Sequence, residues 1–330
     1  MKVAILFLVI AGTVVAQRTS IPIIFDTDIG GDIDDALALA LALQSPELDV
    51  KAVTTVGDQA PLRSRLVWEE LGLFGRQDIP IGTGADEPLL DPARTGRHPQ
   101  LEVLTAEDVV PGPPRRAVDL IVRTLLDSPH KVTIVPVGPL TNIALALKTE
   151  PRIKEKIERI VLMGGAYQLL QPEYNIYCDR IAAEIVFRSG VPITAVGLDV
   201  TTRCKLKAED IERLKAAGHP SSAFLVRLID LWRENPVNLY PTLHDPLAVA
   251  VAMQPSLVET RLGRVEVETA SPMLYGLTLF TPADRLPKDA GAASTRVALN
   301  VDVERFLNLF MERLSARARA SGGLGDQPRQ

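Results

Sequence analysis

Five aspartates lie within ten residues near the start of the chain, where residues 26–35 read DTDIGGDIDD directly after an apolar run. Carboxylates this close repel one another and raise each other's pKa, unless a hard divalent cation that prefers oxygen ligands lies among them. The paired glycines Gly30 and Gly31 let the backbone turn tightly around such an ion. The segment therefore predicts a metal site.

Two simpler explanations account for less of this segment. A helix dipole favours Asp34 and Asp35 at a helix N-terminus, but this explains only two of the five aspartates. A twelve-residue EF-hand loop that begins at Asp26 has its glycine in place at Gly31, but Leu37 stands where calcium needs a bidentate glutamate. The metal site is the better explanation, and it is not an EF-hand.

A histidine and an aspartate, His244 and Asp245, stand side by side at the start of another apolar helix. By itself such a pair is more often a helix cap beside a surface histidine than a functional site. The chain has only four histidines, however, so His244 is one of few side chains that can move a proton near neutral pH. Asp245 can supply another oxygen ligand if it meets the first cluster.

Polar groups also follow other predicted strands. Glu173 and Asn175 are separated by one residue, so on an extended segment they point to the same side and offer acceptors and donors to sugar hydroxyls. The predicted strand at residues 132–137 ends at Val137, whose backbone carbonyl can face the same crevice.

Apolar runs alternate with segments of helical spacing from residue 21 to about residue 316. This pattern predicts a single-domain α/β fold with an open, mostly parallel, Rossmann-like sheet flanked by helices. Ligands bind such sheets at the carboxyl ends of the strands, where the acidic segment lies. We expect strands at residues 21–25, 50–56, 132–137, 160–163, 193–198, 265–267 and 296–301, and helices at residues 34–43, 62–74, 116–126, 140–147, 181–187 and 304–314.

Composition and charge exclude several classes of protein. The 330 residues are 46% hydrophobic and have a formal net charge of -5, so we expect a folded protein that does not bind nucleic acid. Two cysteines cannot form a disulfide framework or a four-cysteine zinc site. Residues 84–114, rich in proline, glycine and arginine, are expected to form a long surface loop.

The ends of the chain differ from the domain at residues 21–316. Residues 1–16 have one lysine, a short apolar run and small residues before Gln17, which is typical of a secretory signal peptide cleaved after Ala16. We therefore expect an exported protein, periplasmic or extracellular, without stable membrane insertion; it would be cytoplasmic if this segment is not a signal. Residues 317–330 are polar and glycine-rich and are expected to be disordered.

Taken together, the motifs resemble those of the inosine-uridine-preferring nucleoside hydrolases in kind and in order. They are DTDIG at residues 26–30 with DDA at 34–36, VTTV at 53–56, VGPLTN at 137–142, LMGG at 162–165, EYN at 173–175, LDVT at 198–201 and HDP at 244–246. Each motif is moderately specific, but their ordered combination over roughly residues 22–314 is highly specific. The resemblance implies the nucleoside hydrolase fold.

The same resemblance implies calcium-dependent hydrolysis of the N-glycosidic bond of ribonucleosides, with release of free base and ribose in nucleoside salvage. By motif, Asp28, Asp35, Asp245 and the Val137 carbonyl would bind Ca²⁺. Asp28 would also take a proton from the attacking water.

For the substrate, the resemblance implies a small-molecule nucleoside held by its ribose hydroxyls. Asp34, Glu173 and Asn175 would bind these hydroxyls, and His244 would protonate the departing base. The family also implies a homodimer or homotetramer.

The chain departs from the usual family motifs at three places. The acidic loop is two residues longer than the common Asp-x-Asp-x-Gly-x-Asp-Asp, so either Asp32 or Asp34 can take the ribose-binding role. Asp58 stands where the family often has an asparagine, which makes it a ribose contact able to alter sugar preference. The loop at residues 166–173 lacks the usual asparagine, which leaves the contact to the ribose 5′ side unassigned.

Two other functions compete with this assignment. Asp26 and Asp28 after a strand imitate the nucleophile and acid of a haloacid-dehalogenase-like phosphatase, but Gly30 stands where that pattern has threonine or valine. A non-catalytic exported protein that binds nucleosides or metal is the second alternative. The intact aspartates and histidine of the motifs argue against it.

Overall fold

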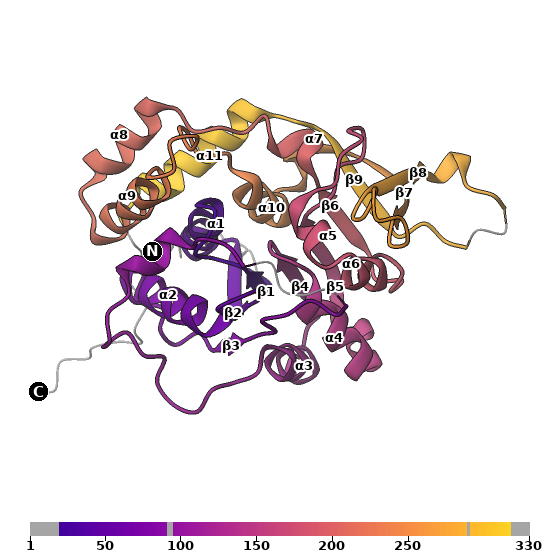
Figure 1. Ribbon diagram of the computed structural model, residues 1–330, viewed down its shortest axis with the longest axis horizontal. Coiled ribbons are helices and arrows are strands. Elements are labelled where there is room, and N and C mark those ends of the chain that lie inside the picture. Colours follow the sequence, from indigo (N-terminus) through magenta and orange to yellow (C-terminus); the bar gives the residue numbers. More distant parts are fainter. Residues whose placement is uncertain (1–19, 91–94, 289–290, 318–330) are drawn as a thin grey trace, which may run out of the picture.

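The computed structural model describes residues 20–90, 95–288 and 291–317 (Figure 1). The expected signal peptide and residues 318–330 of the expected disordered tail lie outside these ranges, so both stay predictions. Among the described helices, none combines the length and the apolar character needed to cross a membrane.

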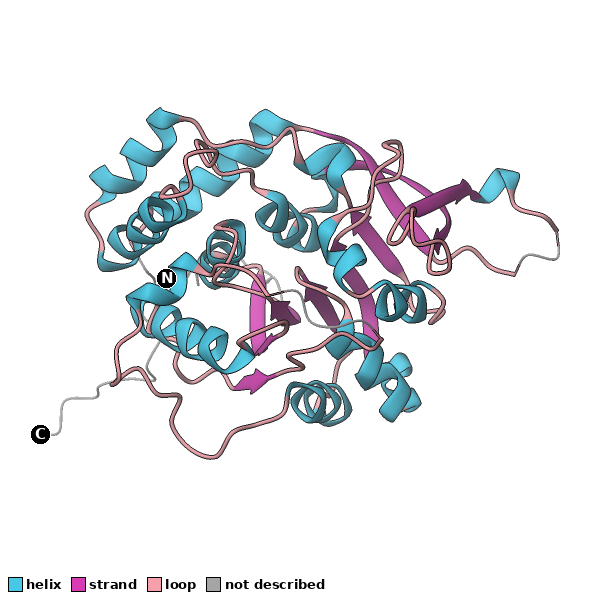
Figure 2. Ribbon diagram, in the orientation of Figure 1, coloured by secondary structure: helices cyan, strands magenta, loops and turns pink. Residues whose placement is uncertain are grey.

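A nine-stranded sheet forms the centre of the domain, and helices cover both of its faces (Figure 2). The strand order is β3-β2-β1-β4-β5-β6-β9-β7-β8. Neighbouring strands are parallel from β3 to β9, whereas β7 is antiparallel to both β9 and β8. The predicted open, mostly parallel sheet is therefore confirmed. The strands are β1 (Ile21–Thr27), β2 (Leu48–Thr55), β3 (Ile81–Thr83), β4 (Val132–Pro136), β5 (Ile157–Met163), β6 (Ile193–Val196), β7 (Val258–Val267), β8 (Thr278–Pro282) and β9 (Thr295–Val301).

Two apolar cores lie on the two faces of the sheet, because alternate strand residues point to opposite sides. The larger core includes residues of α1 (Asp34–Gln44), α2 (Ala60–Leu73), α8 (Ala208–Ala217), α9 (Pro220–Trp232), α10 (His244–Met253) and α11 (Val303–Ser315). The smaller core includes residues of α3 (Ala117–Asp127), α4 (Thr141–Thr149) and α6 (Arg180–Phe187). Central strands such as β4 are buried throughout, which explains their unbroken apolar sequence. The short helices are α5 (Tyr174–Cys178), α7 (Leu198–Thr201), η1 (Pro99–Val103), η2 (Pro151–Lys156), η3 (Pro255–Leu257) and η4 (Ala283–Arg285).

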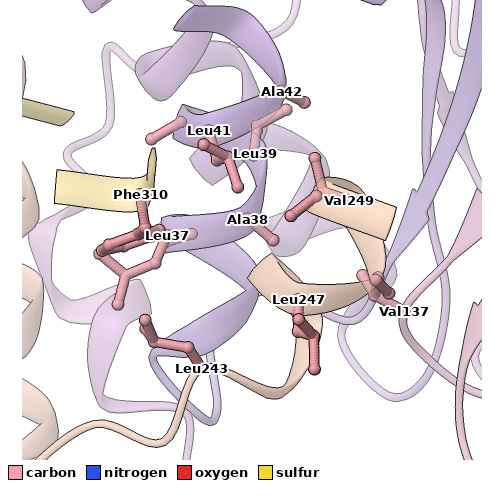
Figure 3. Close-up of a cluster of buried hydrophobic side chains, with 14 of the residues drawn as sticks. Leu37, Ala38, Leu39, Leu41, Ala42, Val137, Leu243, Leu247, Val249 and Phe310 are labelled. Carbon is pink, nitrogen blue, oxygen red and sulfur yellow. The ribbon is translucent and has the colours of Figure 1, made fainter. Parts of the chain in front are cut away.

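Helices α1 and α10 pack side by side in the larger core, where Ala38 of α1 faces Leu247 and its neighbours on α10 (Figure 3). Small alanines along α1 allow this close approach of the two backbones. Asp34 and Asp35 begin α1, and Asp245 lies in the first turn of α10. Packing of the two helices therefore brings acidic residues more than 200 positions apart to the same end of the sheet.

Among the described strands and the helices of eight or more residues, four were not expected from the sequence: β3, β8, α8 and α9. β3 has only three residues, and α8 buries only Ile211 and Leu214, so neither has a strong apolar pattern. In α9, Leu225, Leu228 and Ile229 are buried at helical spacing, and this signal was available in the sequence.

The stretch at residues 84–114 is more than the surface loop expected from its composition. It contains helix η1, in which Gln100 is buried. The Gln100 backbone N–H donates to the Gly30 carbonyl at 3.3 Å. The Gln100 side chain donates to the carbonyls of Gly31 at 3.1 Å and Asp32 at 2.5 Å. This stretch therefore holds the lengthened acidic loop in place, and the expectation of a surface loop was wrong for this part.

Candidate active site

A cavity of about 530 Å³ lies where β1, β4, β5 and β6 end. Eight of the nine predicted site residues line it: Asp28, Asp34, Asp35, Val137, Glu173, Asn175, His244 and Asp245. The ninth, Asp58, lines an adjoining hollow that shares Asp28 and Arg63 with the main cavity. The cavity thus lies at the carboxyl end of the sheet, where the position of the acidic segment predicts a site.

Three buried carboxylates meet where α1 and α10 begin. Asp34, Asp35 and Asp245 each offer an oxygen atom within 4.8 Å of the others. The Asp245 backbone N–H donates to Asp34 Oδ2 at 3.3 Å, which joins the two helix N-termini directly. Positive helix ends favour negative groups here, but the carboxylates still repel one another at this distance.

Burial raises the pKa of Asp34, Asp35 and Asp245 well above the usual value, and the neighbouring aspartates raise it further. A hard divalent cation with oxygen ligands relieves both effects, because it replaces lost hydration and neutralises the repulsion. The donor set is entirely oxygen and therefore fits such an ion. Asp34 belongs to this cluster, whereas Asp32 lies exposed on the cavity rim, where its Oδ1 accepts from the Ile33 N–H at 2.7 Å.

Asp28 lies beside this cluster, directly after β1. Its backbone N–H donates to Asp35 Oδ1 at 3.2 Å, and the Thr27 hydroxyl donates to the same oxygen at 2.5 Å. A Cβ at Gly138 would lie only 2.7 Å from Asp28 Oδ1, so this position after β4 needs glycine for the close approach. Burial raises the pKa of Asp28, while the charge of Arg63 lowers it.

Glu173 and Asn175 line the cavity, but not from the extended segment that their spacing suggested. Glu173 is the N-cap of α5, and its carboxylate accepts from the backbone N–H groups of Gly165, Asn175 and Ile176 at 2.9–3.1 Å. Asn175 lies in the first turn of α5, and its Nδ2 donates to the Val137 carbonyl at 2.7 Å. The expected extended conformation was wrong, because the Glu173 carboxylate caps a short helix instead.

His244 lies on the cavity wall at the start of α10. Its Nδ1 is 2.7 Å from the Thr201 hydroxyl, so α7 fixes the orientation of the ring. Burial lowers the pKa of His244 to about 4, and the charge of Lys205 lowers it as well.

The family model described as inosine-uridine preferring nucleoside hydrolase matches residues 23–308. The chain belongs to this family. It is accordingly an N-glycosyl hydrolase, and the phosphatase alternative is wrong.

Curated relatives and solved structures cover nearly the whole nucleoside hydrolase. The pyrimidine-specific ribonucleoside hydrolase RihA of Citrobacter koseri is 39% identical over 312 residues, which cover 90% of this chain and 98% of that protein. A solved plant nucleoside hydrolase, PpNRh1, superimposes with a TM-score of 0.81 at 31% identity, over 90% of this chain and all of the other. A purine-preferring ribonucleoside hydrolase from Gardnerella vaginalis gives a TM-score of 0.77 at 32% identity, over 91% of this chain and all of the other.

Arg63 of this nucleoside hydrolase is a site residue that sequence reasoning missed. The side chain is only 3% exposed, and its Nη1 donates to the backbone carbonyls of Asp28 and, at 2.7 Å, of Ile29. The Arg63 guanidinium thus contacts the backbone of the acidic loop. The available signal was its spacing on α2, where Arg63 shares a buried face with Leu66 and Val67.

Asp58 and His98 form a second pair of the nucleoside hydrolase that the sequence did not connect. His98 Nε2 lies 2.9 Å from both carboxylate oxygens of Asp58, and Arg63 Nη2 lies 3.0 Å from Asp58 Oδ1. Burial alone would raise the pKa of Asp58, but the hydrogen bonds and charges of His98 and Arg63 lower it below the usual value. His98 lies in the stretch expected to be a surface loop, and no local motif marks it.

Proposed function

We propose that this nucleoside hydrolase uses Ca²⁺ to cleave the N-glycosidic bond of ribonucleosides, releasing free base and ribose for salvage. One observation carries the proposal: the buried carboxylates of Asp34, Asp35 and Asp245 converge beside Asp28 in one cavity. Such a group of oxygen ligands suits calcium, which takes six to eight oxygens in flexible geometry.

The carboxylates of Asp28, Asp35 and Asp245 would hold the ion together with the Val137 carbonyl. That carbonyl accepts one hydrogen bond from Asn175 and keeps a second lone pair for a cation. A divalent cation in this position would make a water molecule more acidic, so that a carboxylate beside it can take its proton near neutral pH.

Asp28 would take the proton that this water loses as its oxygen bonds to C1′ of the ribose. Asp34, Glu173 and Asn175 would hold the ribose hydroxyls, and the negative charge of Asp34 and Glu173 would favour the positive charge that develops on the sugar. His244 would donate a proton to the departing base from the cavity wall.

The direct test measures release of base and ribose from a panel of purine and pyrimidine nucleosides. The panel must cover both, because one relative is named pyrimidine-specific and another purine-preferring. We expect release with calcium, loss of release after treatment with a chelator, and recovery when calcium is restored. A calcium-loaded protein inert on every nucleoside, or release that the chelator leaves unchanged, would contradict the proposal.

Asp28→Asn tests the assignment of the base. It removes the proton acceptor while keeping the size of the side chain, so we expect kcat to fall by about 10²-fold to 10⁴-fold. Asp78→Asn is the matched control, because the Asp78 side chain is 66% exposed and lies outside the cavity. Equal kinetics of the two variants would show that Asp28 is not the base.

We also propose that the protein is exported after cleavage behind Ala16 and assembles as a homodimer or homotetramer. Mass spectrometry of the mature N-terminus and light scattering of the purified protein test these two points. Unprocessed Met1 in a cytoplasmic extract would refute export, and a monomer would refute assembly.

A further inference from the structure

The cavity has an apolar wall beside its buried carboxylates. Met163 ends β5, Pro172 lies in the segment that leads into α5, and Leu198 begins α7; all three line the cavity. Met163 pairs in register with Val196 of β6, so this wall is built on the ends of two neighbouring strands. The Asn175 amide lies 3.5 Å from Met163 Sδ and joins the wall to the polar part of the cavity.

The segment between β5 and α5 directs its polar groups away from the cavity. The backbone N–H groups of Tyr167 and Gln168 donate to the Asp199 carboxylate at 2.8 and 2.6 Å. The Tyr167 hydroxyl and the Gln168 amide donate to backbone carbonyls at 2.9 and 3.3 Å. Among residues 164–172, all of which the structure describes, only Pro172 lines the cavity, and proline has no N–H to donate.

The two polar side chains that follow Pro172 already have partners within the protein. Glu173 Oε1 accepts one backbone N–H and Oε2 accepts two, so most of the roughly four lone pairs of this carboxylate are used without substrate. The Tyr174 hydroxyl interacts with the Cys178 side chain, which lines the adjoining hollow and not the main cavity. A substrate that lacks a hydroxyl at this wall therefore leaves neither group unpaired.

We propose that this wall is an apolar subsite for the 5′ end of the substrate, so that the enzyme cleaves ribonucleosides with an uncharged, apolar 5′ group; this inference rests on the proposed function. The base and C5′ extend from opposite ends of the ribose ring. In the proposed function the ribose hydroxyls lie at Asp34 and Asn175, and the base lies toward His244. C5′ is therefore directed toward Met163 and Pro172.

The substrate class that fits is the 5′-deoxy- and 5′-alkylthio-ribonucleosides. The reaction is unchanged: the C1′–N bond breaks with its electron pair going to the base, and water supplies the hydroxyl on C1′ and, overall, the proton on the base. The 5′ group stays on the released sugar.

The preference follows from the groups that each 5′ substituent meets. A site that hydrogen-bonds a hydroxyl discriminates strongly against an analogue that lacks it, because the polar groups of the site lose their partner. Met163 and Pro172 offer no such group, so loss of the 5′ hydroxyl costs little, and a methylthio group against them removes apolar surface from water. A 5′-phosphate is disfavoured, because it meets the Glu173 carboxylate and finds no N–H at Pro172.

The test compares forms of the ribonucleoside whose base the panel releases fastest: the 5′-deoxy, 5′-deoxy-5′-methylthio, 5′-monophosphate and 2′-deoxy forms. We expect kcat/KM of the 5′-deoxy form to lie within about threefold of that of the ribonucleoside, and kcat/KM of the methylthio form to be equal or up to about 10-fold higher. The 5′-monophosphate and the 2′-deoxy form should each lose about 10²-fold or more, because the first places a charge at the wall and the second removes a hydroxyl from the carboxylates.

Two substitutions make the wall polar. Met163→Gln places an amide of similar size there and should lower kcat/KM of the methylthio form, relative to the ribonucleoside, by about 10-fold or more. Met273→Gln is the matched control and should leave this ratio unchanged, because the Met273 side chain is 93% exposed and lies outside the cavity. Pro172→Asn adds an amide at an exposed position and should favour the ribonucleoside over the 5′-deoxy form by about 10-fold.

Each other result overturns the inference. A 5′-deoxy form that loses more than about threefold would show that the 5′ hydroxyl is bound, and a 5′-monophosphate cleaved as well as the ribonucleoside would show that the wall is not apolar. Met163→Gln with the substrate ratio of the wild type would also contradict it; if this variant fails to fold by circular dichroism, the ratio shown by Pro172→Asn decides alone. A wild-type protein inert on every riboside would overturn the proposed function, whereas cleavage of the ribonucleoside without its 5′-deoxy form overturns only the subsite.

Discussion

Arg63 shows how single residues make a crowded acidic site possible. Its guanidinium binds the backbone carbonyls of Asp28 and Ile29 and the Asp58 carboxylate, while the side chain is 3% exposed. A buried cation in contact with its partners offsets part of the repulsion among the aspartates above it. Burial raises the pKa of Asp28 and Asp35, and the charge of Arg63 opposes this rise, which favours the ionised form that a base and a metal ligand require.

Arg63→Met tests this role at the scale of the residue. Loss of the cation removes one partner of the buried Asp58 carboxylate and the side-chain donor to the carbonyls of Asp28 and Ile29, so we expect the free energy of unfolding to fall by about 3 to 5 kcal/mol. Urea denaturation of the metal-free protein measures it. Arg123→Met, at an exposed position on α3, is the control, and equal stability of the two variants would show that Arg63 contributes nothing.

At the scale of elements, the site depends on three segments that are distant in sequence. Helices α1 and α10 place their acidic first turns together through the contact around Ala38 and Leu247 (Figure 3). Helix η1 then holds the lengthened loop, because its Gln100 donates to the carbonyls of Gly31 and Asp32. The two extra residues of the loop are therefore accommodated by a partner from elsewhere in the chain.

Gln100→Ala should weaken this support without removing any proposed ligand. We expect calcium affinity to fall by about 10-fold to 100-fold, as when groups that orient metal ligands are removed. Isothermal titration calorimetry with calcium measures the change. Gln77→Ala removes an exposed glutamine away from the cavity and should bind calcium as the wild type does; equal affinity of the two variants would contradict the role of Gln100.

In the whole molecule, several carboxyl groups are buried close together at the carboxyl end of the sheet. Asp26 is completely buried in β1, where Oδ1 accepts from Thr54 and Asn142 and Oδ2 has no partner among the described residues. Burial raises its pKa from the ordinary 3.8 to about 7. The carboxyls of Asp34, Asp35 and Asp245 shift in the same direction, so the folded protein holds protons that the unfolded chain releases.

Stability of the metal-free protein should therefore fall as pH rises. These carboxyls contribute their full stability below about pH 4, and Asp26 loses its contribution as pH rises through about 7. Burial lowers the pKa of His244 from 6.5 to about 4, so this side chain makes stability rise with pH between these two values. Because several carboxyls have the opposite effect, we expect the fall with pH to dominate. Thermal unfolding at pH 5 and pH 8 tests the sign, and a metal-free protein more stable at pH 8 would contradict it.

Calcium should remove most of the loss of stability at high pH, because the carboxylates that bind the ion must be ionised. At a free concentration one hundred times Kd, the ion adds about 2.7 kcal/mol to the free energy of unfolding. The same melting experiment with calcium should give a higher Tm at pH 8 than the metal-free protein shows. An unchanged Tm would contradict a calcium site in the folded state.

The sequence by itself determined the fold class, the acidic loop and eight of the residues that line the cavity. These properties are local: apolar alternation predicts strands and helices, and the carboxyl end of a parallel sheet is where ligands bind. Eight of the nine predicted site residues line one cavity for that reason.

Only the tertiary structure decided how the site is completed. Arg63, His98 and Gln100 belong to a helix and a proline-rich stretch whose local patterns carry no chemical signal, and each meets the acidic loop through packing. Asp58 likewise carries a charge whose partners no spacing reveals. Contacts between segments far apart in sequence depend on how elements pack, and a motif written along one segment cannot specify them.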